Sequence, residues 1–349
     1  MKTLTIQEII RFSKDTLTAV GVNEADAQIV AESIADAHQR EKHTHGMGRL
    51  AIYVRKIRSG QMSADTEITT VCEKGVITVV DAHDGFGQVA GYKGVQSCVE
   101  KASVYGVGIY GVRNSNSFGA ASYLGKLFTQ KNMIGIVMGN ASKALCPPGG
   151  NKACLGTNPI CFAFPGTQKH PDMILDMACA VAARGKVRLA LRNGELIPEH
   201  WGNDAAGNPS TDPAKVLEGS INAFGGYKGF GLATVVEMMA GVITGSSFAD
   251  EVLPLNTPTG LSRYGHFLCA VSPQFFMEQE EYAARFDYLV EYIKSCGEAG
   301  SVFMPGEQSQ MKIDNNKTSV QIPDSIIEDM NALSRSVGVN PIEIKEQME

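Results

Sequence analysis

Residues 76–90 read VITVVDAHDGFGQVA, and this stretch decides between two kinds of fold. Its β-branched run at 76–80 predicts a strand, and the segment from Val89 to about Tyr105 predicts a helix. Between them, residues 85–90 match G-x-G-x-x-A, at the place where a Rossmann dinucleotide fingerprint would stand. A Rossmann domain is therefore one hypothesis for this unit.

That hypothesis needs a further residue which the chain lacks. A Rossmann unit holds a ribose with an acidic residue about 20 positions further on, at the end of the next strand. The next strand is predicted at 107–112, and it ends in Arg113-Asn114-Ser115 with no acid. Asp84 precedes the turn, and Glu100 lies inside the predicted helix. We therefore interpret residues 85–90 as a tight turn between a strand and a helix, not as a cofactor site.

Outward from this unit, the spacing of apolar residues predicts helices at both ends of the chain and a mixed middle. Thr5 and Asn23 are predicted to cap the first two helices, and a third follows residues 46–48 and stops at Gly60. Further strands are expected at 134–138 and 267–271, and further helices at about 229–244, 278–296 and 324–337. The helix at 229–244 is apolar on nearly all sides, which indicates burial.

The composition excludes several classes of protein. Of 349 residues, 44% are apolar and 19% are charged, which is typical of a folded chain of about two domains. Lys and Arg number 31 against 37 Asp and Glu, so the net charge of −6 offers no basic surface for nucleic acid. No stretch of 18 apolar residues predicts a membrane span, and residues 1–20 carry charges where a signal peptide would be apolar. We expect a soluble cytoplasmic protein.

The cysteines and glycines allow two further predictions, one about metal binding and one about turns of the backbone. The eight cysteines form no C-x-x-C pair and none has a histidine at zinc-finger spacing, so we expect reduced thiols and assign no metal. The 37 glycines show no collagen period and no clustering. We expect them at turns and at close approaches of the backbone.

Among the seven histidines, His45 has the setting of a catalytic group. The segment Thr44-His45-Gly46 interrupts a helical pattern, and Arg49 follows one turn into the next helix. An imidazole can donate a proton near neutral pH, and a guanidinium binds a carboxylate with two hydrogen bonds. The pair suits a 2-oxo or 2-hydroxy acid, because hydride addition at carbon needs a proton at oxygen. The spacing alone also fits an Arg49 that merely pairs with a nearby acid.

The segment from Thr44 to Leu50, with Tyr53 and Gly60, resembles the S-H-G-x-x-R-(L/F) opening of the type 2 malate/L-lactate dehydrogenase family. That family includes ureidoglycolate dehydrogenase, 2,3-diketo-L-gulonate reductase, sulfolactate dehydrogenase and the piperideine/pyrroline-2-carboxylate reductases. Similar segments follow in order along nearly the whole chain, at 84–88, 112–119, 147–150, 156–159, 175–178, 185–187, 198–204, 226–232 and 305–307.

The resemblance implies an α/β (α+β) fold that is not a Rossmann fold and that binds a nicotinamide cofactor, NAD or NADP, on a largely antiparallel central sheet. It also implies a homodimer with sites near the subunit boundary. We expect a helical domain for substrate and dimer contacts from residues 1–70 with 310–349. A cofactor-binding domain, residues 71–309, would be inserted between its two parts.

By the same resemblance, His45 is the proton donor or acceptor and Arg49 anchors the substrate carboxylate, with Ser117 and Thr157 also on the substrate side. The cofactor contacts are assigned to four segments: Asn140-Ala141-Ser142, Asp176-Met177-Ala178, Lys228 and Pro305-Gly306-Glu307. The first could bind phosphate or ribose through backbone N–H groups, and Lys228 stands before a helix N-terminus that suits a pyrophosphate. Asp176 could also orient His45.

One position departs from the family pattern. Many relatives carry a second histidine in S-N-H-F-G, and this chain has Ser117 there. A serine hydroxyl can hydrogen-bond a substrate but cannot relay protons near neutral pH. We therefore expect proton transfer to rest on His45 alone, with more room beside the substrate.

Three functions follow from these residues. The first is an NAD(P)-dependent oxidoreductase that interconverts a small 2-oxo acid and its L-2-hydroxy acid by hydride transfer. A close alternative reduces a cyclic ketimine carboxylate, of the piperideine or pyrroline type, in which the proton goes to nitrogen. A catalytically silent cofactor-binding homologue is the third. In each case the expected partner is a small carboxylate, with no nucleic acid and no membrane.

Overall fold

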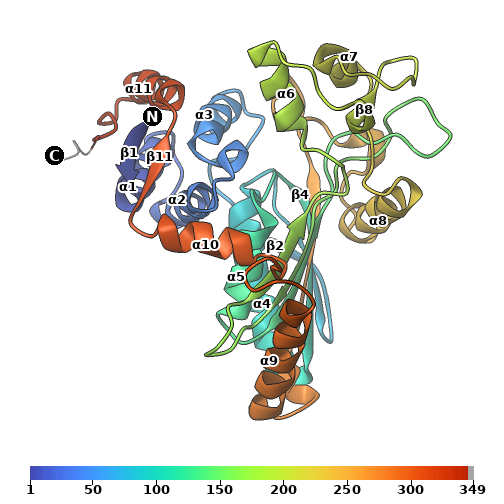
Figure 1. Cartoon of the computed structure of the whole chain (residues 1–349). Helices are drawn as coiled ribbons and strands as arrows, with labels where there is room; N and C mark the ends of the chain where they lie inside the picture. Colours follow the sequence, from blue (N-terminus) through green and yellow to red (C-terminus); the bar gives the residue numbers. More distant parts are fainter. Residues whose placement is uncertain (345–349) are drawn as a thin grey trace.

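The computed structural model describes residues 1–344, and a seven-stranded sheet runs through its centre (Figure 1). The strands lie in the order β2 (Thr69–Lys74), β3 (Ile77–Asp81), β4 (Val107–Ser115), β10 (Tyr264–Val271), β5 (Ile134–Gly139), β6 (Ile160–Phe164) and β7 (Met173–Met177). Every neighbouring pair is antiparallel except β3 with β4. The expected mixed fold with a largely antiparallel, non-Rossmann sheet is confirmed.

The single parallel pair explains why residues 85–90 look like a dinucleotide fingerprint. Strand β3, helix α4 (Gly87–Tyr105) and strand β4 form one strand-helix-strand crossover, whose turn needs glycine for packing. A Cβ at Gly87 would collide with the carbonyl oxygen of Asn116. His83 and Asp84, just before it, adopt left-handed φ values of 45° and 59°. The interpretation of 85–90 as a structural turn is therefore supported by the packing.

Helices cover both faces of the sheet. Helix α4 and helix α5 (Ala121–Thr129) bury Leu124 and Phe128 on one face. Helix α8 (Tyr227–Glu237) and the π-helical turn Met238–Val242 lie on the other, where Val236 contacts the sheet. The helix expected at 229–244 is thus present but only half buried. Its outer side is apolar and open to solvent, with exposed fractions of 50% at Val235, 48% at Met238 and 41% at Val242.

The two ends of the chain build a shared helical unit. It comprises α1 (Ile6–Thr18), α2 (Glu24–Gln39), α3 (Leu50–Arg58), α10 (Glu307–Asn315) and α11 (Asp324–Val337), with β1 (Lys2–Thr5) antiparallel to β11 (Ser319–Ile322). Thr5 and Asn23 cap α1 and α2 as predicted, accepting hydrogen bonds from Glu8 N (3.1 Å) and Asp26 N (2.9 Å). The domain assignment 1–70 with 310–349 stays a prediction, and its last residues, 345–349, lie outside the described part.

A third unit, which the sequence did not single out, lies at the far side of the sheet. It contains α6 (Arg184–Asn193), α7 (Pro213–Glu218) and the short pair β8 (Gly202–Asn203) and β9 (Ser220–Ile221), around a core of its own. Helix α9 (Gln279–Ser295) extends from the opposite end of the sheet (Figure 1). Within residues 1–344, no helix is both long enough and apolar enough to cross a membrane.

Candidate active site

The predicted catalytic pair lies on a tight turn between α2 and α3. Two short 3₁₀ turns, His43–His45 and Met47–Arg49, replace the helix there. The hydroxyl oxygen of Thr44 lies 3.1 Å from His45 Nδ1, and Arg49 Nε donates a 2.6 Å hydrogen bond to the carbonyl oxygen of Thr44. The turn therefore holds the imidazole and the guanidinium side by side, as their spacing predicted.

The surroundings of His45 favour its neutral form. Desolvation and the positive charge of Arg49 together lower the pKa of His45 from 6.5 to about 4, although Asp176 acts in the opposite direction. Because Nδ1 faces Thr44, Nε2 is the nitrogen that remains for a substrate. In the free enzyme near pH 7, His45 is thus a base that is ready to accept a proton.

Two tyrosines border Arg49. Burial raises the pKa of Tyr53 and of Tyr264, and the charge of Arg49 opposes the rise at both hydroxyls, as does Ser142 at Tyr264. Tyr53 lies in α3, directly after the turn that ends at Arg49, but Tyr264 arrives on β10, where it pairs with Ser115. Sequence reasoning missed Tyr264, because only the pairing of distant strands brings it here.

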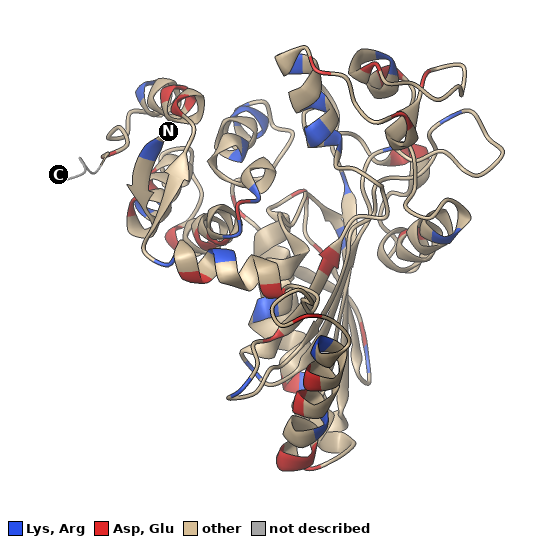
Figure 2. Ribbon diagram, viewed as in Figure 1, with Lys and Arg blue, Asp and Glu red and all other residues tan. Residues whose placement is uncertain are grey.

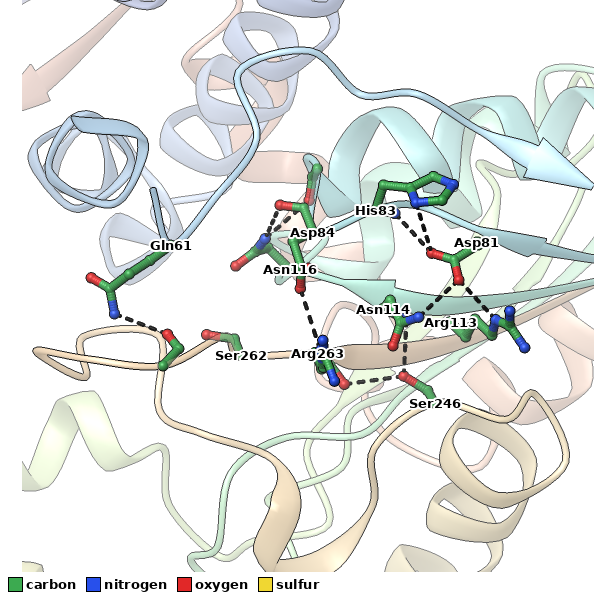
Figure 3. A network of polar contacts seen from close by, with 12 residues as sticks. Gln61, Asp81, His83, Asp84, Arg113, Asn114, Asn116, Ser246, Ser262 and Arg263 are labelled. Carbon is green, nitrogen blue, oxygen red and sulfur yellow. Dashed lines mark hydrogen bonds and ion pairs between the residues drawn. The ribbon is translucent and has the colours of Figure 1, made fainter. Parts of the chain in front are cut away.

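The loop that carries Ser117 is fixed by its neighbour Asn116. The buried ammonium of Lys56 donates to Asn116 Oδ1 at 2.8 Å, and Asn116 Nδ2 donates to the carbonyl oxygen of Asp84 at 2.7 Å. Figure 3 shows this contact beside Asp81, which accepts hydrogen bonds from side chains at the end of β4. The Ser117 hydroxyl itself accepts only a 3.3 Å bond from Gly119 N. The hydrogen bonds of Asn116 hold this loop in place, and the Ser117 oxygen keeps a lone pair for a substrate.

Asp176 is held by Lys42 and not by His45. Lys42 Nζ donates to Asp176 Oδ2 at 2.5 Å, and Ser122 N donates to the same oxygen at 3.0 Å. Burial raises the pKa of Asp176, but these partners outweigh it and keep the pKa below its usual value. The carboxylate acts on His45 through its charge, without a hydrogen bond.

Two of the predicted cofactor segments meet beside this ion pair. The N–H of Ile174 donates to Pro305 O at 3.1 Å, and Gly306, with a φ of 87°, approaches so closely that a Cβ would lie 2.5 Å from Ile174 O. Together they border a cleft of about 590 Å³ whose lining includes Arg40, Lys42, Asp176, Met304 and Ser309. Ligand pockets have volumes of about 300–1,000 Å³. The volume of this cleft lies within that range, and its lining carries cations and polar side chains.

The chain after Asp176 continues this surface toward Lys228. Cys179 N donates to Thr157 O at 2.7 Å, and Phe224 N donates to Cys179 O at 3.1 Å. The glycines 225 and 226 then turn with φ values of 56° and 63° into α8, where Lys228 is exposed. A second cleft of about 490 Å³ lies at this turn, between residues 146–150 and 222–227. Backbone hydrogen bonds thus link the segment 174–179 to Pro305, to Thr157 and to the turn that precedes Lys228.

Other predicted contacts are engaged within the chain. Asn140 is buried; its amide nitrogen donates to Glu237 Oε1 (3.2 Å), and its oxygen accepts from Gly265 N (2.8 Å). The N–H of Ala141 donates to Asn158 Oδ1 at 3.2 Å. The N–H groups of Asn140 and Ala141 are therefore used internally, and Ala141 and Ser142 are both partly exposed. The Glu307 carboxylate pairs with Lys294 and accepts from Met304 N.

Comparisons with known proteins identify the family of the chain. The profile of the malate/L-lactate dehydrogenase family matches residues 4–331, which is nearly the whole chain. The chain belongs to this family. It is 35% identical to an L-sulfolactate dehydrogenase of Methanothermobacter thermautotrophicus over 341 residues, covering 97% of this chain and 98% of the relative. It is 29% identical to a Delta(1)-pyrroline-2-carboxylate reductase of Pseudomonas fluorescens, covering 95% and 98%.

Among solved structures, the sulfolactate dehydrogenase from Methanocaldococcus jannaschii superimposes with a TM-score of 0.91 at 36% identity, covering 98% of this chain and all of that one. This member of the malate/L-lactate dehydrogenase family is accordingly an NAD(P)-dependent oxidoreductase of the 2-oxo acid/2-hydroxy acid class, which confirms the prediction from the sequence.

Proposed function

We propose that this dehydrogenase interconverts a small 2-oxo acid that bears a second anionic group and the corresponding L-2-hydroxy acid. The observation that carries the proposal is the turn on which a neutral, half-buried His45 stands beside Arg49. Arg49 is the carboxylate anchor, because its guanidinium can form two parallel hydrogen bonds to one carboxylate. His45 is the proton carrier, because its Nε2 is free of partners on the turn.

In the oxidation direction, Arg49 holds the carboxylate, and His45 Nε2 accepts the hydroxyl proton as the C2 hydride leaves. The nicotinamide ring, when bound, supplies the acceptor for that hydride. Ser117 and Thr157 border the substrate and orient it by hydrogen bonds. In the reverse direction, the imidazolium of His45 returns the proton to the carbonyl oxygen of the 2-oxo acid.

The second anionic group would face helix α6, which is rich in positive charge. Arg184, Lys186, Arg188 and Arg192 lie on this helix with no acidic residue among them (Figure 2). Its second residue, Gly185, is packed against the catalytic turn, since a Cβ there would lie 2.9 Å from Thr44 Cγ2. Malate and sulfolactate, which appear in the names of the relatives, are both dianions of this kind.

A panel of substrates tests the proposal. We expect reduced-nicotinamide absorbance to fall with oxaloacetate or sulfopyruvate, faster than with the monoanion pyruvate, in the presence of NADH or NADPH. We expect Lys186→Met to raise the KM of the dianions and to leave the KM of pyruvate unchanged. Absence of turnover on the whole panel with both cofactors refutes the proposal.

The same panel separates the alternatives. The reductase relative from Pseudomonas fluorescens favours a cyclic ketimine as the second candidate substrate. Faster turnover of Δ1-pyrroline-2-carboxylate than of any 2-oxo acid would establish that function. Calorimetric binding of a nicotinamide cofactor without any turnover would instead identify a catalytically silent homologue.

The cofactor would be held along three segments that backbone hydrogen bonds link: Pro305-Gly306, Asp176-Met177-Ala178 and the turn that leads to Lys228. The carboxylate of Glu307 and the loop Asn140-Ala141-Ser142 would support this surface from behind, with Ser142 the member nearest the substrate. Either NAD or NADP fits this assignment, and titrations with each cofactor, followed by protein fluorescence, decide between them. Lys228→Met should weaken binding of both, because a cation near the pyrophosphate is lost.

The protein would work as a homodimer, with the helical unit from 1–70 and 310–349 serving substrate and dimer contacts. The outer side of α8 and of the π-helical turn after it is apolar at Val235, Met238 and Val242, which supports a second copy as its cover, because monomers rarely expose such a row. Light scattering coupled to size-exclusion chromatography measures the mass directly. We expect twice the chain mass for the wild type and the single mass for Met238→Glu.

A further inference from the structure

His38, near the end of α2, packs against the turn that carries His45 and Arg49. Its side chain is fully buried, and its Nε2 accepts a 2.9 Å hydrogen bond from the backbone N–H of Met47. Met47 is two residues from His45 and two from Arg49. One buried nitrogen therefore holds the backbone at the midpoint between the proton carrier and the carboxylate anchor.

The imidazole ring also fills the space beneath Gly46. A Cβ at Gly46 would collide with Nε2, Cε1 and Cδ2 of His38. The φ of Gly46 is −84°, which any residue can adopt, so the need for glycine here comes from the ring and not from the backbone conformation. The backbone of the turn lies directly on the imidazole.

The hydrogen bond defines the state of His38. Accepting at Nε2 requires a neutral ring with its proton on Nδ1. Burial, with a contribution from His43, lowers the pKa of His38 to about 3, so the ring stays neutral throughout the working range. Its Nδ1 lies 3.4 Å from Nδ1 of His43, and the two rings are 5.5 Å apart between centroids. His43 thus accepts from the same ring that supports Met47.

We propose that His38 is a positioning residue, which fixes the Met47 N–H and the backbone of Gly46 and so sets the geometry of His45 and Arg49. The inference rests on the proposed function for the direction of its effect on catalysis. A misplacement of about 1 Å of a catalytic group costs about a hundredfold in rate. Loss of this hydrogen bond and packing should therefore lower kcat and leave the cofactor Kd nearly unchanged.

Two substitutions of His38 distinguish its role as a hydrogen-bond acceptor for Met47 from its role in filling space. His38→Gln offers an amide oxygen as acceptor to Met47 N–H, whereas His38→Ala removes the acceptor and leaves a cavity. We expect His38→Ala to lower kcat about tenfold to a hundredfold with the cofactor Kd changed less than twofold, and His38→Gln to recover most of the loss. Equal loss in both variants, or no loss in either, would overturn the assignment.

The packing has its own test in a double-variant cycle. In the wild-type background, Gly46→Ala should lower kcat strongly, because the new methyl group collides with the His38 ring. In the His38→Ala background, the same substitution should lower kcat much less, since the space that the imidazole filled is open. An equal loss of kcat in the two backgrounds would show that the need for glycine at position 46 does not come from the His38 ring. Thermal unfolding of all four proteins identifies any variant that fails to fold.

An NMR titration of His45 requires no turnover and therefore tests the role of His38 independently of the proposed function. In protein labelled with ¹³C at histidine Cε1, the His45 signal can be assigned with a His45→Gln sample and titrated by NMR. We expect the pKa of His45 to move from about 4 toward 6.5 in His38→Ala and to stay near 4 in His38→Gln, because a loosened turn admits water. An unchanged His45 pKa in His38→Ala refutes the inference, even if the wild type turns over no member of the panel.

Discussion

The acidity of His45 makes a sharp prediction about the pH dependence of the two directions of reaction. Reduction of a 2-oxo acid by a reduced nicotinamide consumes one proton. The ratio of kcat/KM for reduction to kcat/KM for oxidation must therefore fall tenfold for each pH unit, whatever the enzyme does. The pKa of His45 decides which of the two rates carries that change over a given range of pH.

With a pKa of about 4, the protonated fraction of His45 is about one in eleven at pH 5 and about one in a thousand at pH 7. We expect kcat/KM for reduction to fall about a hundredfold between these pH values, and kcat/KM for oxidation to change by only about 10%. A histidine at 6.5 would behave differently. Its reduction rate would fall only about fourfold, and its oxidation rate would rise about 25-fold.

The assay follows nicotinamide absorbance in both directions, at saturating cofactor, from pH 5 to 8. His83→Asn is a suitable control, because His83 lies away from the turn and asparagine tolerates its left-handed backbone. That variant should keep both profiles. An oxidation rate that rises steeply between pH 5 and 7, with a nearly flat reduction rate, would refute a neutral His45 in the free enzyme.

Three further changes test the site and its support. His45→Ala should lower kcat by about two to four orders of magnitude in both directions, and retained activity would move the proton role to another group. Arg49→Lys should raise the substrate KM much more than the cofactor Kd, because an ammonium cannot form the paired hydrogen bonds of a guanidinium, and an unchanged KM would contradict the anchor role. Lys56→Met should lower the free energy of unfolding by about 1–3 kcal/mol in urea titrations, since Asn116 Oδ1 loses its buried donor. The exposed Lys74→Met should have little effect on stability.

The sequence predicted the local elements well, and the reasons are local. Thr5 and Asn23 bond to N–H groups three residues away, so their role as caps needs no information about the rest of the chain. The last helix begins at Asp324 and ends at Val337, where the predicted range of 324–337 placed it. The missing acid after residues 107–112 excluded a Rossmann unit correctly, because that fold needs a specific side chain at one strand end. The pairing of His45 with Arg49 also follows from positions only four residues apart.

The depth of burial was harder to predict. The apolar helix α8 was expected to be buried on all sides, yet one face is open in the single chain. Asn140 was assigned to a cofactor through its place after a strand, and only the fold shows that Glu237, far along the chain, already binds its amide. Composition along one segment tells how apolar it is, but not which neighbour covers it.

By itself, the sequence determined the family, the reaction class, several helices and strands and the turn that carries His45 and Arg49, because each depends on residues close together in the chain. The tertiary structure alone decided that Tyr264 borders Arg49, that Asp176 pairs with Lys42 and that the segments 174–179, 224–228 and 305–306 form one surface. It also placed the ring of His38 beneath Gly46. These contacts depend on strand pairing and packing between distant segments, which hydrophobic periodicity does not encode.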